Sequence, residues 1–326
     1  MAQSRSTAVV LINLGTPEKP TPSAVRSYLG AFLWDKRVVE IPRVLWWLIL
    51  NGIILTFRPA KVAKLYAQIW TPDGSPMRVI LRQQAKKLSL LFAQEGVDHI
   101  QVEGAMTYGF PNIRKIINKM LGDGVEKIIF LPLYPQYSAT TTAAAFDQIA
   151  RTLADIRNIP EIVFIKSYHD HPDYIAALAN SIRESGTLDD ENTRLVFSFH
   201  GIPQRFADAG DPYPEHCRIT ADLVAKELSL TGDRWEMAFQ SRFGKAQWLE
   251  PYLDKRLEQL PQDGIKSVAI CCPAFSADCL ETLEEIAVEN KETFMAAGGD
   301  SYHYIPALND GDDHIDCLKN IVVKYL

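Results

Sequence analysis

The sequence lacks the features that mark several large classes of protein. Its five cysteines form an odd set without C-x-x-C spacing, so they support neither a disulfide framework nor a zinc ribbon, and we expect reduced thiols. They are Cys217, Cys271, Cys272, Cys279 and Cys317. The 34 Lys and Arg residues are outnumbered by 40 Asp and Glu residues, which argues against nucleic acid as a partner.

Membrane-directed segments are also missing. Residues 1–15 lack the charged start, long apolar stretch and small-residue cleavage site of a signal peptide, so we expect a cytoplasmic protein. The strongest apolar run, Val44–Phe57, is interrupted by Asn51-Gly52 and is shorter than the ~20 residues that a spanning helix needs. It is not expected to cross a bilayer.

The pattern that is present alternates strands with helices, and it occurs twice. Apolar runs bounded by turn residues predict four strands in each half, separated by stretches of helical periodicity. The predicted strands are Ala8–Leu14, Gln101–Thr107, Lys127–Leu133 and Ile162–Ser167, then Arg194–Phe199, Trp235–Gln240, Ser267–Cys272 and Tyr302–Pro306. This order predicts an α/β protein with parallel sheets in two similar units.

The spacing of equivalent strands supports an internal repeat. The last three pairs lie roughly 133 to 140 residues apart, whereas the first pair lies roughly 186 apart. About fifty extra residues therefore separate the first two strands of the N-terminal half, where the apolar run occurs.

Open parallel sheets bind ligands at the carboxyl ends of their strands, so the residues that follow each strand matter most. These ends read NLGTP, YGFP, PLYPQYS, FHGIP, QSRFG and PAFSADCLE. None is a glycine-rich phosphate loop of the G-x-G-x-x-G or G-x-x-x-x-G-K-S/T type, so a nucleotide ligand has no support.

Two kinds of side chain at these ends could carry chemistry. His200 closes an apolar strand, although a histidine there is more often a hydrogen-bonded structural residue. Glu281, Glu285 and Glu289 follow at helical spacing and could form an acidic line, although the spacing by itself favours a structural role. The alternative is a capping box of Asp278 with Glu281, followed by a solvated helix face. His200 and Glu281 could share one Fe²⁺, as an incomplete site suited to a metal in transit.

Six ordered blocks carry a more specific signal. They read LINLGTPEKPT, FLPLYPQYSATTT, FSFHGIPQRF, GDPYPEHC, FQSRFG and PAFSADCLETLEEI, and together they resemble the ferrochelatase family nearly from end to end. The resemblance implies an α/β fold of two Rossmann-like, chelatase-type domains with a porphyrin cleft between them. We place the domains at residues 1–165, with an apolar lip at about 30–75, and at residues 166–326, whose last helix could pack back on the first.

The resemblance also implies the activity, a lyase that inserts Fe²⁺ into protoporphyrin IX to give protohaem in haem biosynthesis. It implies that His200 and Glu281 handle the metal and the catalysis, with Glu285 and Glu289 as an acidic relay. The porphyrin-binding positions that it implies are Arg58, Tyr66, Ser75, Tyr134, Trp248 and Phe275. Aromatic faces suit a flat macrocycle, and Arg58 suits a propionate.

Three positions depart from the family pattern. Thr107 stands where many relatives have arginine, so a polar contact there is in doubt, and Cys279 stands where some have histidine, so it receives no metal role. Some relatives hold a [2Fe–2S] cluster with C-terminal cysteines and one after YPQYS, where Ala139 stands here. We therefore expect Fe²⁺ as substrate, no permanently bound cofactor and no cluster.

Other polar segments are assigned no site. His169 and His171 in SYHDHPDY fit a helix start at Pro172, and the acidic GDDH at 311–314 is read as an exposed helix start. Two rival functions remain open at this point. One is a chelatase for another tetrapyrrole or metal, and the other is a haem or porphyrin carrier without chemistry.

The apolar run Val44–Phe57 has two interpretations. It is either a buried core helix, or a lip that covers the porphyrin and touches the membrane surface. We favour the lip, because the C-terminal half has no equivalent stretch, and we expect a cytoplasmic protein whose peripheral contact with a membrane is left open.

Overall fold

The computed structural model describes residues 6–97, 99–244 and 246–326. Contacts divide the chain into two compact units. Unit 1 contains the residues up to Tyr134, Ser138–Ser167 and Leu318–Leu326. Unit 2 contains Pro135–Tyr137 and Tyr168–Cys317. The chain therefore enters unit 2 briefly after Tyr134, and returns to unit 1 at its last residues.

Unit 1 is built on four strands, β1 (Thr7–Asn13), β2 (Ile100–Met106), β3 (Lys127–Pro132) and β4 (Glu161–Phe164). Its helices are α1 (Pro22–Leu33), α2 (Arg43–Ile49), α3 (Leu55–Ile69), α4 (Pro76–Gln94), α5 (Ile113–Gly122) and α6 (Ala144–Leu153), with π-helical turns η1 (Leu50–Ile54) and η2 (Ala139–Ala143). The final helix α12 (Asp312–Val323) begins in unit 2 and ends in unit 1.

Unit 2 repeats this plan with β5 (Thr193–His200), β6 (Trp235–Gln240), β7 (Ser267–Cys271) and β8 (Ser301–Ile305). Its helices are α7 (Pro172–Glu184), α8 (Gln204–Asp208), α9 (Tyr213–Glu227), α10 (Leu253–Gln259) and α11 (Lys291–Ala296), with a ten-residue π-helix, η3 (Glu281–Asn290). Each of the eight predicted strands is confirmed, with ends that differ by at most a few residues.

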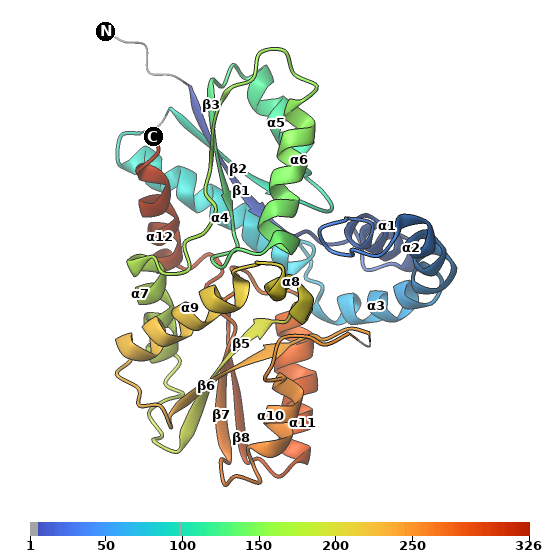
Figure 1. The fold of residues 1–326 in the computed structure, drawn as a ribbon. Coiled ribbons are helices and arrows are strands. Elements are labelled where there is room, and N and C mark those ends of the chain that lie inside the picture. The colour runs from blue at the N-terminus through green and yellow to red at the C-terminus, as the bar shows by residue number, and fades with distance from the viewer. Residues whose placement is uncertain (1–5, 98, 245) are drawn as a thin grey trace. The chain divides into compact units, whose positions relative to one another are not determined.

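The two sheets have the same topology. Their orders are β2-β1-β3-β4 and β6-β5-β7-β8, and every neighbouring pair is parallel (Figure 1). In each, the chain moves from the first strand to a neighbour on one side and then crosses to the other side. The switch points therefore lie between β1 and β3 and between β5 and β7, where such sheets bind ligands.

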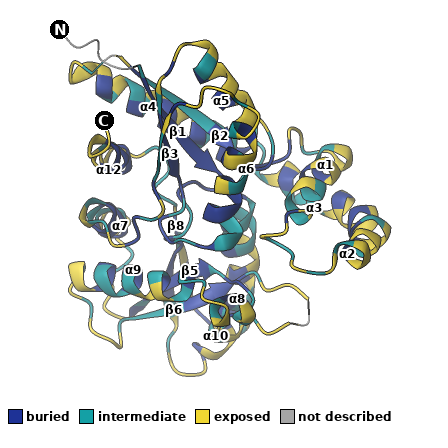
Figure 2. Ribbon diagram, turned by 45° about the horizontal axis from the view of Figure 1, so that its top comes forward, coloured by how far each residue is buried: buried dark blue, intermediate teal, exposed yellow. Residues whose placement is uncertain are grey.

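Each sheet is buried between helices, which explains why its strands appear in the sequence as apolar runs. All seven residues of β1 are buried (Figure 2). In unit 1, Ile117 of α5 and Ile149 of α6 pack on Val10 and Phe130 of the sheet. Fully burying one such aliphatic side chain stabilises the fold by about 1.5–3 kcal/mol.

The extra residues of unit 1 form a helical arm of α1, α2 and α3, which extends away from its sheet (Figure 1). The described residues include no helix that is both long enough and apolar enough to span a bilayer. Trp46 is only 4 % exposed, and its indole N–H donates to the carbonyl of Leu33 at 2.7 Å. Trp46, Leu50 and Ile54 share a small core inside the arm.

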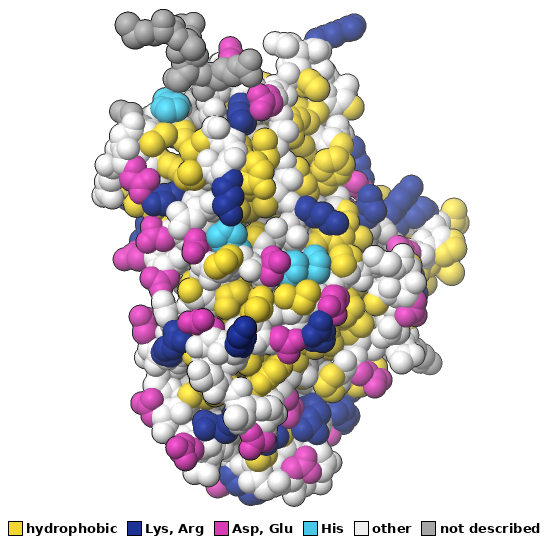
Figure 3. Space-filling view, turned by 60° about the vertical axis from the view of Figure 1, so that its left-hand side comes forward, with side chains coloured by type: hydrophobic (Ala, Val, Ile, Leu, Met, Phe, Trp, Pro, Cys, Tyr) yellow, Lys and Arg dark blue, Asp and Glu magenta, His cyan; other side chains and the backbone are white. Residues whose placement is uncertain are grey.

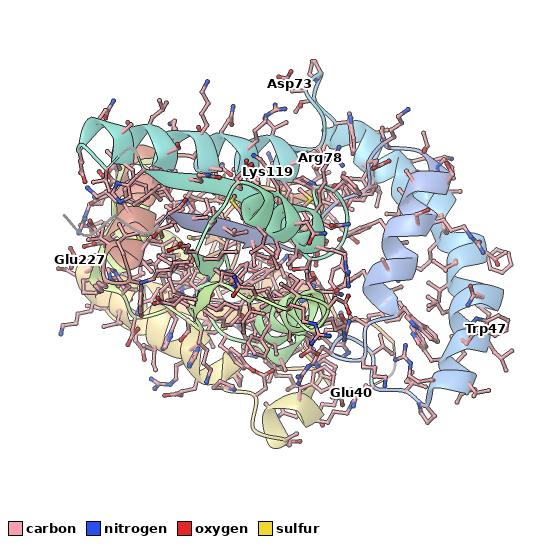
Figure 4. The ribbon with its side chains drawn as sticks, turned by 90° about the horizontal axis from the view of Figure 1, so that it is seen from above. Glu40, Trp47, Asp73, Arg78, Lys119 and Glu227 are labelled. Atoms are coloured by element: carbon pink, nitrogen blue, oxygen red, sulfur yellow. The ribbon has the colours of Figure 1, made fainter. Side chains whose placement is uncertain are left out.

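The opposite face of the same segment is in solvent. Six apolar side chains are more than half exposed there, namely Val44, Leu45, Trp47, Leu48, Ile53 and Phe57. Trp47 projects outward from α2 (Figure 4). Neither interpretation of Val44–Phe57 therefore holds for the whole segment, because adjacent residues of a helix point to different sides.

The expectation that the whole GDDH segment is an exposed helix start is wrong for one residue of helix α12. Asp312 and Asp313 stand in its exposed first turn, as expected, but His314 is buried. Its Nδ1 lies 2.6 Å from the carbonyl oxygen of Asn309 and therefore donates the hydrogen. Burial lowers the pKa of His314 from its ordinary 6.5 to about 4.

His314 should make the fold sensitive to acid. As pH falls below the ordinary pKa of histidine, the unfolded chain takes up a proton that the folded chain refuses until pH about 4. The free energy of unfolding should therefore fall through this window, by up to ~1.4 kcal/mol per pH unit from this group. Urea unfolding of His314→Gln between pH 7 and 4 should show a flatter dependence on pH. His303→Gln, at an exposed position, is the control, and equal slopes for wild type and His314→Gln would contradict the assignment.

Candidate active site

His200 is the last residue of β5 and stands beside the switch point of unit 2. Its side chain is partly exposed. The ring Nδ1 lies 2.7 Å from the carbonyl oxygen of Gly201, which can only accept a hydrogen bond. Nδ1 thus carries the hydrogen, and in the neutral ring Nε2 keeps its lone pair for a proton or a metal ion.

Gly201 allows Trp248 to approach the strand end. The backbone of Gly201 donates to the carbonyl of Gln240 at 2.8 Å, and Pro203 pairs with Trp248 in an isolated bridge. A β-carbon at Gly201 would lie 3.2 Å from Cε3 of Trp248 and 3.0 Å from the oxygen of Gln240. The absence of a side chain therefore lets an indole ring lie next to the residue that follows His200.

Glu281 begins the π-helix η3, which follows β7 and so reaches the same switch point. Leu280, directly before it, already has a helical backbone, and the first backbone hydrogen bond of the helix runs from Leu283 to the carbonyl of Cys279 at 2.9 Å. The capping-box interpretation of Asp278 with Glu281 stays a prediction. Glu281 is partly exposed, and it interacts electrostatically with Glu285 and with the thiol of Cys279.

Glu285 is the most strongly held acid of the set. Its Oε2 accepts the hydroxyl of Ser241 at 2.5 Å and the amide nitrogen of Gln240 at 3.5 Å. Burial raises the pKa of Glu285 above its ordinary value, and nearby Glu281 adds to the rise. The hydrogen bonds from Ser241 and Gln240, together with nearby His200, oppose it. His200 and Glu281 thus both lie near enough to Glu285 to influence its pKa.

Glu289 lies further along the same helix and is exposed at the surface. The segment Glu281–Asn290 is a π-helix and not the α-helix that the spacing suggested. In either kind of helix, side chains four residues apart stay near one face, so the acidic line of Glu281, Glu285 and Glu289 stays a prediction.

Gln240 and Ser241 are functional candidates that the sequence reasoning did not single out. The Gln240 side chain accepts from the Ser198 hydroxyl at 2.7 Å and donates to the Glu281 carbonyl at 3.5 Å as well as to Glu285. Ser241 has a left-handed backbone with φ of 63°. The available signal was their position in QSRFG, directly after β6.

The remaining porphyrin candidates lie in both units. In unit 2, Phe275 follows β7 and packs partly buried against the core. In unit 1, Arg58 is exposed on α3, Tyr66 is buried on the same helix, and Ser75 is the buried N-cap residue of α4. Tyr66 also packs edge to face with Trp70.

Tyr134 follows β3 and therefore lies at the switch point of unit 1. Burial raises the pKa of its hydroxyl, which lies near the side chain of Thr107. Tyr108, next to Thr107, donates its hydroxyl to Asp35 at 2.8 Å and so ties the base of the arm to the strand ends. Thr107 thus keeps a polar neighbour at the position where it departs from the family pattern.

Two other histidines predicted to be structural lie outside this cluster. Helix α7 begins at Pro172 with His171 as its N-cap residue, so the predicted helix start is confirmed. His169 stacks on His216 with ring centroids 3.6 Å apart. Burial lowers the pKa of His169, which favours a neutral ring in this stack.

The arrangement in unit 2 suits proton and metal transfer. It offers an imidazole nitrogen and two carboxylates, which are ligands that divalent iron accepts and side-chain types that serve as general acids and bases. Among the described residues, no group of three or more His, Cys, Asp or Glu side chains is arranged so that it could hold a metal ion.

Solved structures with a similar fold are chelatases. SirB from Bacillus subtilis with Fe³⁺ matches with a TM-score of 0.56 and 14% identity, covering 98% of this chain and 95% of that chain. The sirohydrochlorin chelatase SirB from Bacillus subtilis subspecies spizizenii in complex with cobalt matches with a TM-score of 0.55 and 12% identity, covering 98% and 94%. The chain therefore has the fold of the chelatase class.

Sequence comparison identifies the family. The ferrochelatase family model matches residues 6–326. A ferrochelatase of Actinobacillus pleuropneumoniae is 54% identical over 314 residues, 96% of this chain and 97% of the relative. Ferrochelatase 2 of Shewanella oneidensis is 52% identical over 98% and 97%, and a ferrochelatase of Vibrio cholerae is 49% identical over 99% of each chain. The chain belongs to the ferrochelatase family and is a metal chelatase of the lyase class.

Removing the Ser241 hydroxyl should alter the proton chemistry of Glu285. Without this hydrogen bond the pKa of Glu285 rises further, so the acid is protonated at higher pH and the acidic limb of the kcat profile should move to higher pH. Loss of one hydrogen bond to a carboxylate should lower kcat at neutral pH by about tenfold. Ser241→Gly keeps the left-handed backbone accessible, and Ser229→Gly, at an exposed position with φ of 56°, is the control. An unshifted pH profile for Ser241→Gly would reject the role.

Proposed function

We propose that the chain inserts Fe²⁺ into protoporphyrin IX to form protohaem, with His200 and Glu281 at the reacting centre. The observation that supports this assignment is that His200 and Glu281, which follow neighbouring strands of the second sheet, both influence the buried Glu285, in a chain of the ferrochelatase family. Both proposed metal-handling residues belong to unit 2.

The reaction requires acceptors for two protons. Two pyrrole N–H groups lose their protons as Fe²⁺ bonds to the ring nitrogens, so one porphyrin and one ferrous ion give one haem and two protons. His200 can accept a proton at Nε2, because Nδ1 already donates to Gly201. Glu281, partly exposed at the start of η3, delivers iron or relays protons toward Glu285. The exposed Glu289 would form the outer end of this relay.

The ring-binding positions follow from side-chain chemistry. Trp248 and Phe275 offer aromatic surface beside the strand ends of unit 2, and Tyr134 does so in unit 1. Tyr66 is a further aromatic candidate, although its ring is buried on α3. Ser75 is a further candidate contact. Arg58 has the charge and the exposure to pair with a propionate.

The proposed chemistry uses iron as substrate and needs no iron–sulfur cluster. Ala139 occupies the position after YPQYS at which some relatives have a cluster cysteine. All five cysteines are buried and free. Burial raises the pKa of Cys271 to about 12 and that of Cys272 and Cys279 above the ordinary value, so these thiols remain protonated and are poor metal ligands.

The exposed face of the arm is proposed to contact the membrane surface at the periphery, without crossing it. Val44, Trp47 and Phe57 present apolar surface, and Arg43, Lys61 and Lys64 add positive charge on the same helices. Elsewhere, Figure 3 shows charges of both signs interspersed over the face that it draws, with no gathering of basic side chains of the kind that attracts nucleic acid.

Substitution at the reacting centre should stop chemistry without preventing ring binding. His200→Ala and Glu281→Gln should each lower kcat at least ~100-fold, while the Kd for protoporphyrin changes only a few-fold, since both residues act on the reacting atoms. Anaerobic assays with Fe²⁺ and protoporphyrin, followed by the haem spectrum, measure this. Wild-type turnover in both variants would contradict the assignment of these residues to the reacting centre. Parallel assays with Co²⁺, Ni²⁺ and other tetrapyrroles test the competing chelatase specificity.

The two neighbouring tryptophans of the arm should behave differently. Trp47→Ser should weaken binding to liposomes and raise KM for protoporphyrin, with little change in melting temperature, because this side chain is 55 % exposed. Trp46→Ser should instead destabilise the arm by about 3–5 kcal/mol, since it removes a buried aromatic ring. Vesicle flotation and thermal melts separate the two effects. A large loss of stability in Trp47→Ser would contradict the surface role.

A further inference from the structure

Asp278 is a buried acid three residues before Glu281. It is 7 % exposed, and its carboxylate accepts hydrogen bonds from side chains of three different segments. The hydroxyl of Tyr304 at the end of β8 donates at 2.5 Å, the hydroxyl of Thr282 in the first turn of η3 at 2.9 Å, and the amide of Asn309 at 2.7 Å. These contacts offset the cost of removing the charge from water.

Asn309 makes the most specific of these contacts, because its bond to Asp278 is reciprocal. Its Nδ2 donates to Oδ2 of Asp278, while its Oδ1 accepts the backbone N–H of Asp278 at 2.8 Å. The asparagine has a left-handed backbone with φ of 49°, and its carbonyl is held by the buried ring of His314. A non-glycine residue held in this region is a local strain that surrounding contacts must maintain.

This pair is connected to the start of η3. The first turn has one backbone hydrogen bond, from Leu283 to the carbonyl of Cys279 at 2.9 Å, and side chains add further contacts to it. The backbone N–H of Cys279 donates to Oγ1 of Thr282, which itself donates to Asp278. On the other side of the turn, Gln240 donates to the carbonyl of Glu281. The first turn of η3 is therefore tied to Asp278 on one side and to β6 on the other.

We propose that Asn309 is a positioning residue for Glu281. Asn309 clamps Asp278 in place, and Asp278 in turn holds the first turn of η3. The inference rests on the role of Glu281 proposed above. It extends that role to the loop after β8, which contains none of the candidate metal or porphyrin residues. A displacement of about 1 Å in a reacting group can cost roughly 100-fold in rate, so a remote clamp of this kind has a measurable effect.

The test variant is Asn309→Gly, because glycine adopts the left-handed backbone without strain and removes only the side chain. We expect kcat to fall roughly 10- to 100-fold with KM for protoporphyrin and for Fe²⁺ within a few-fold of wild type. Amide hydrogen exchange in residues 277–284 should become faster under native conditions. The matched control is Asn180→Ala, which removes a partly exposed asparagine that donates to Asp313 at 2.8 Å in the same unit, and it should leave kcat unchanged.

A second variant keeps the test informative if Asn309→Gly does not fold. Asn309→Asp keeps the left-handed preference and the acceptor for the Asp278 amide, but replaces the donor with a carboxylate that repels Asp278. It should lower kcat at least as much as Asn309→Gly. Wild-type kcat in both folded variants overturns the proposal, as does a fall in melting temperature with unchanged kcat.

Glu281→Gln, assayed in parallel, separates this inference from the proposed function. If Glu281→Gln is inactive and the folded Asn309 variants are fully active, only the clamp is rejected. If Glu281→Gln retains wild-type turnover, the proposed reacting centre is rejected, and the clamp with it.

Discussion

The second unit depends on holding two carboxylates, Asp278 and Glu285, away from bulk water without leaving either unpaired. An unpaired buried carboxylate would cost several kcal/mol, so each must be surrounded by donors. Glu285 receives them from Ser241 and Gln240 at the end of β6, and Asp278 receives one from Tyr304 at the end of β8. The parallel sheet brings these strand ends to one edge and so makes the arrangement possible.

The same constraint shapes the chemistry. Because burial raises the pKa of Glu285, this acid can hold and release a proton closer to neutrality than an exposed glutamate. The neighbouring His200 directs its Nδ1 hydrogen to a backbone carbonyl, which leaves the other nitrogen for exchange. His200, Glu281 and the buried Glu285 are the residues on which the proposed proton transfer rests.

The two repeated units share one framework but differ in the features placed on it. Both units have the same strand order and the same switch point, yet the acid–imidazole cluster occurs in unit 2 and the apolar arm in unit 1. The two units therefore differ in side chains and insertions and not in the framework that carries them. The connection from β1 to β2 contains α1–α4, whereas the connection from β5 to β6 contains α8 and α9.

The sequence alone determined the eight strands, because strands covered on both faces must be apolar throughout. The strand ends indicated the segments that contain His200 and Glu281, but their predicted roles came from the resemblance to the family. It could not determine that Glu281–Asn290 is a π-helix, since the acidic spacing also fits an α-helix. It could not separate Trp46 from Trp47, because which neighbour is buried depends on how the arm packs. Nor could it join Asp278 to Asn309, 31 residues away in the chain, because only the tertiary structure brings a buried charge and its donor together.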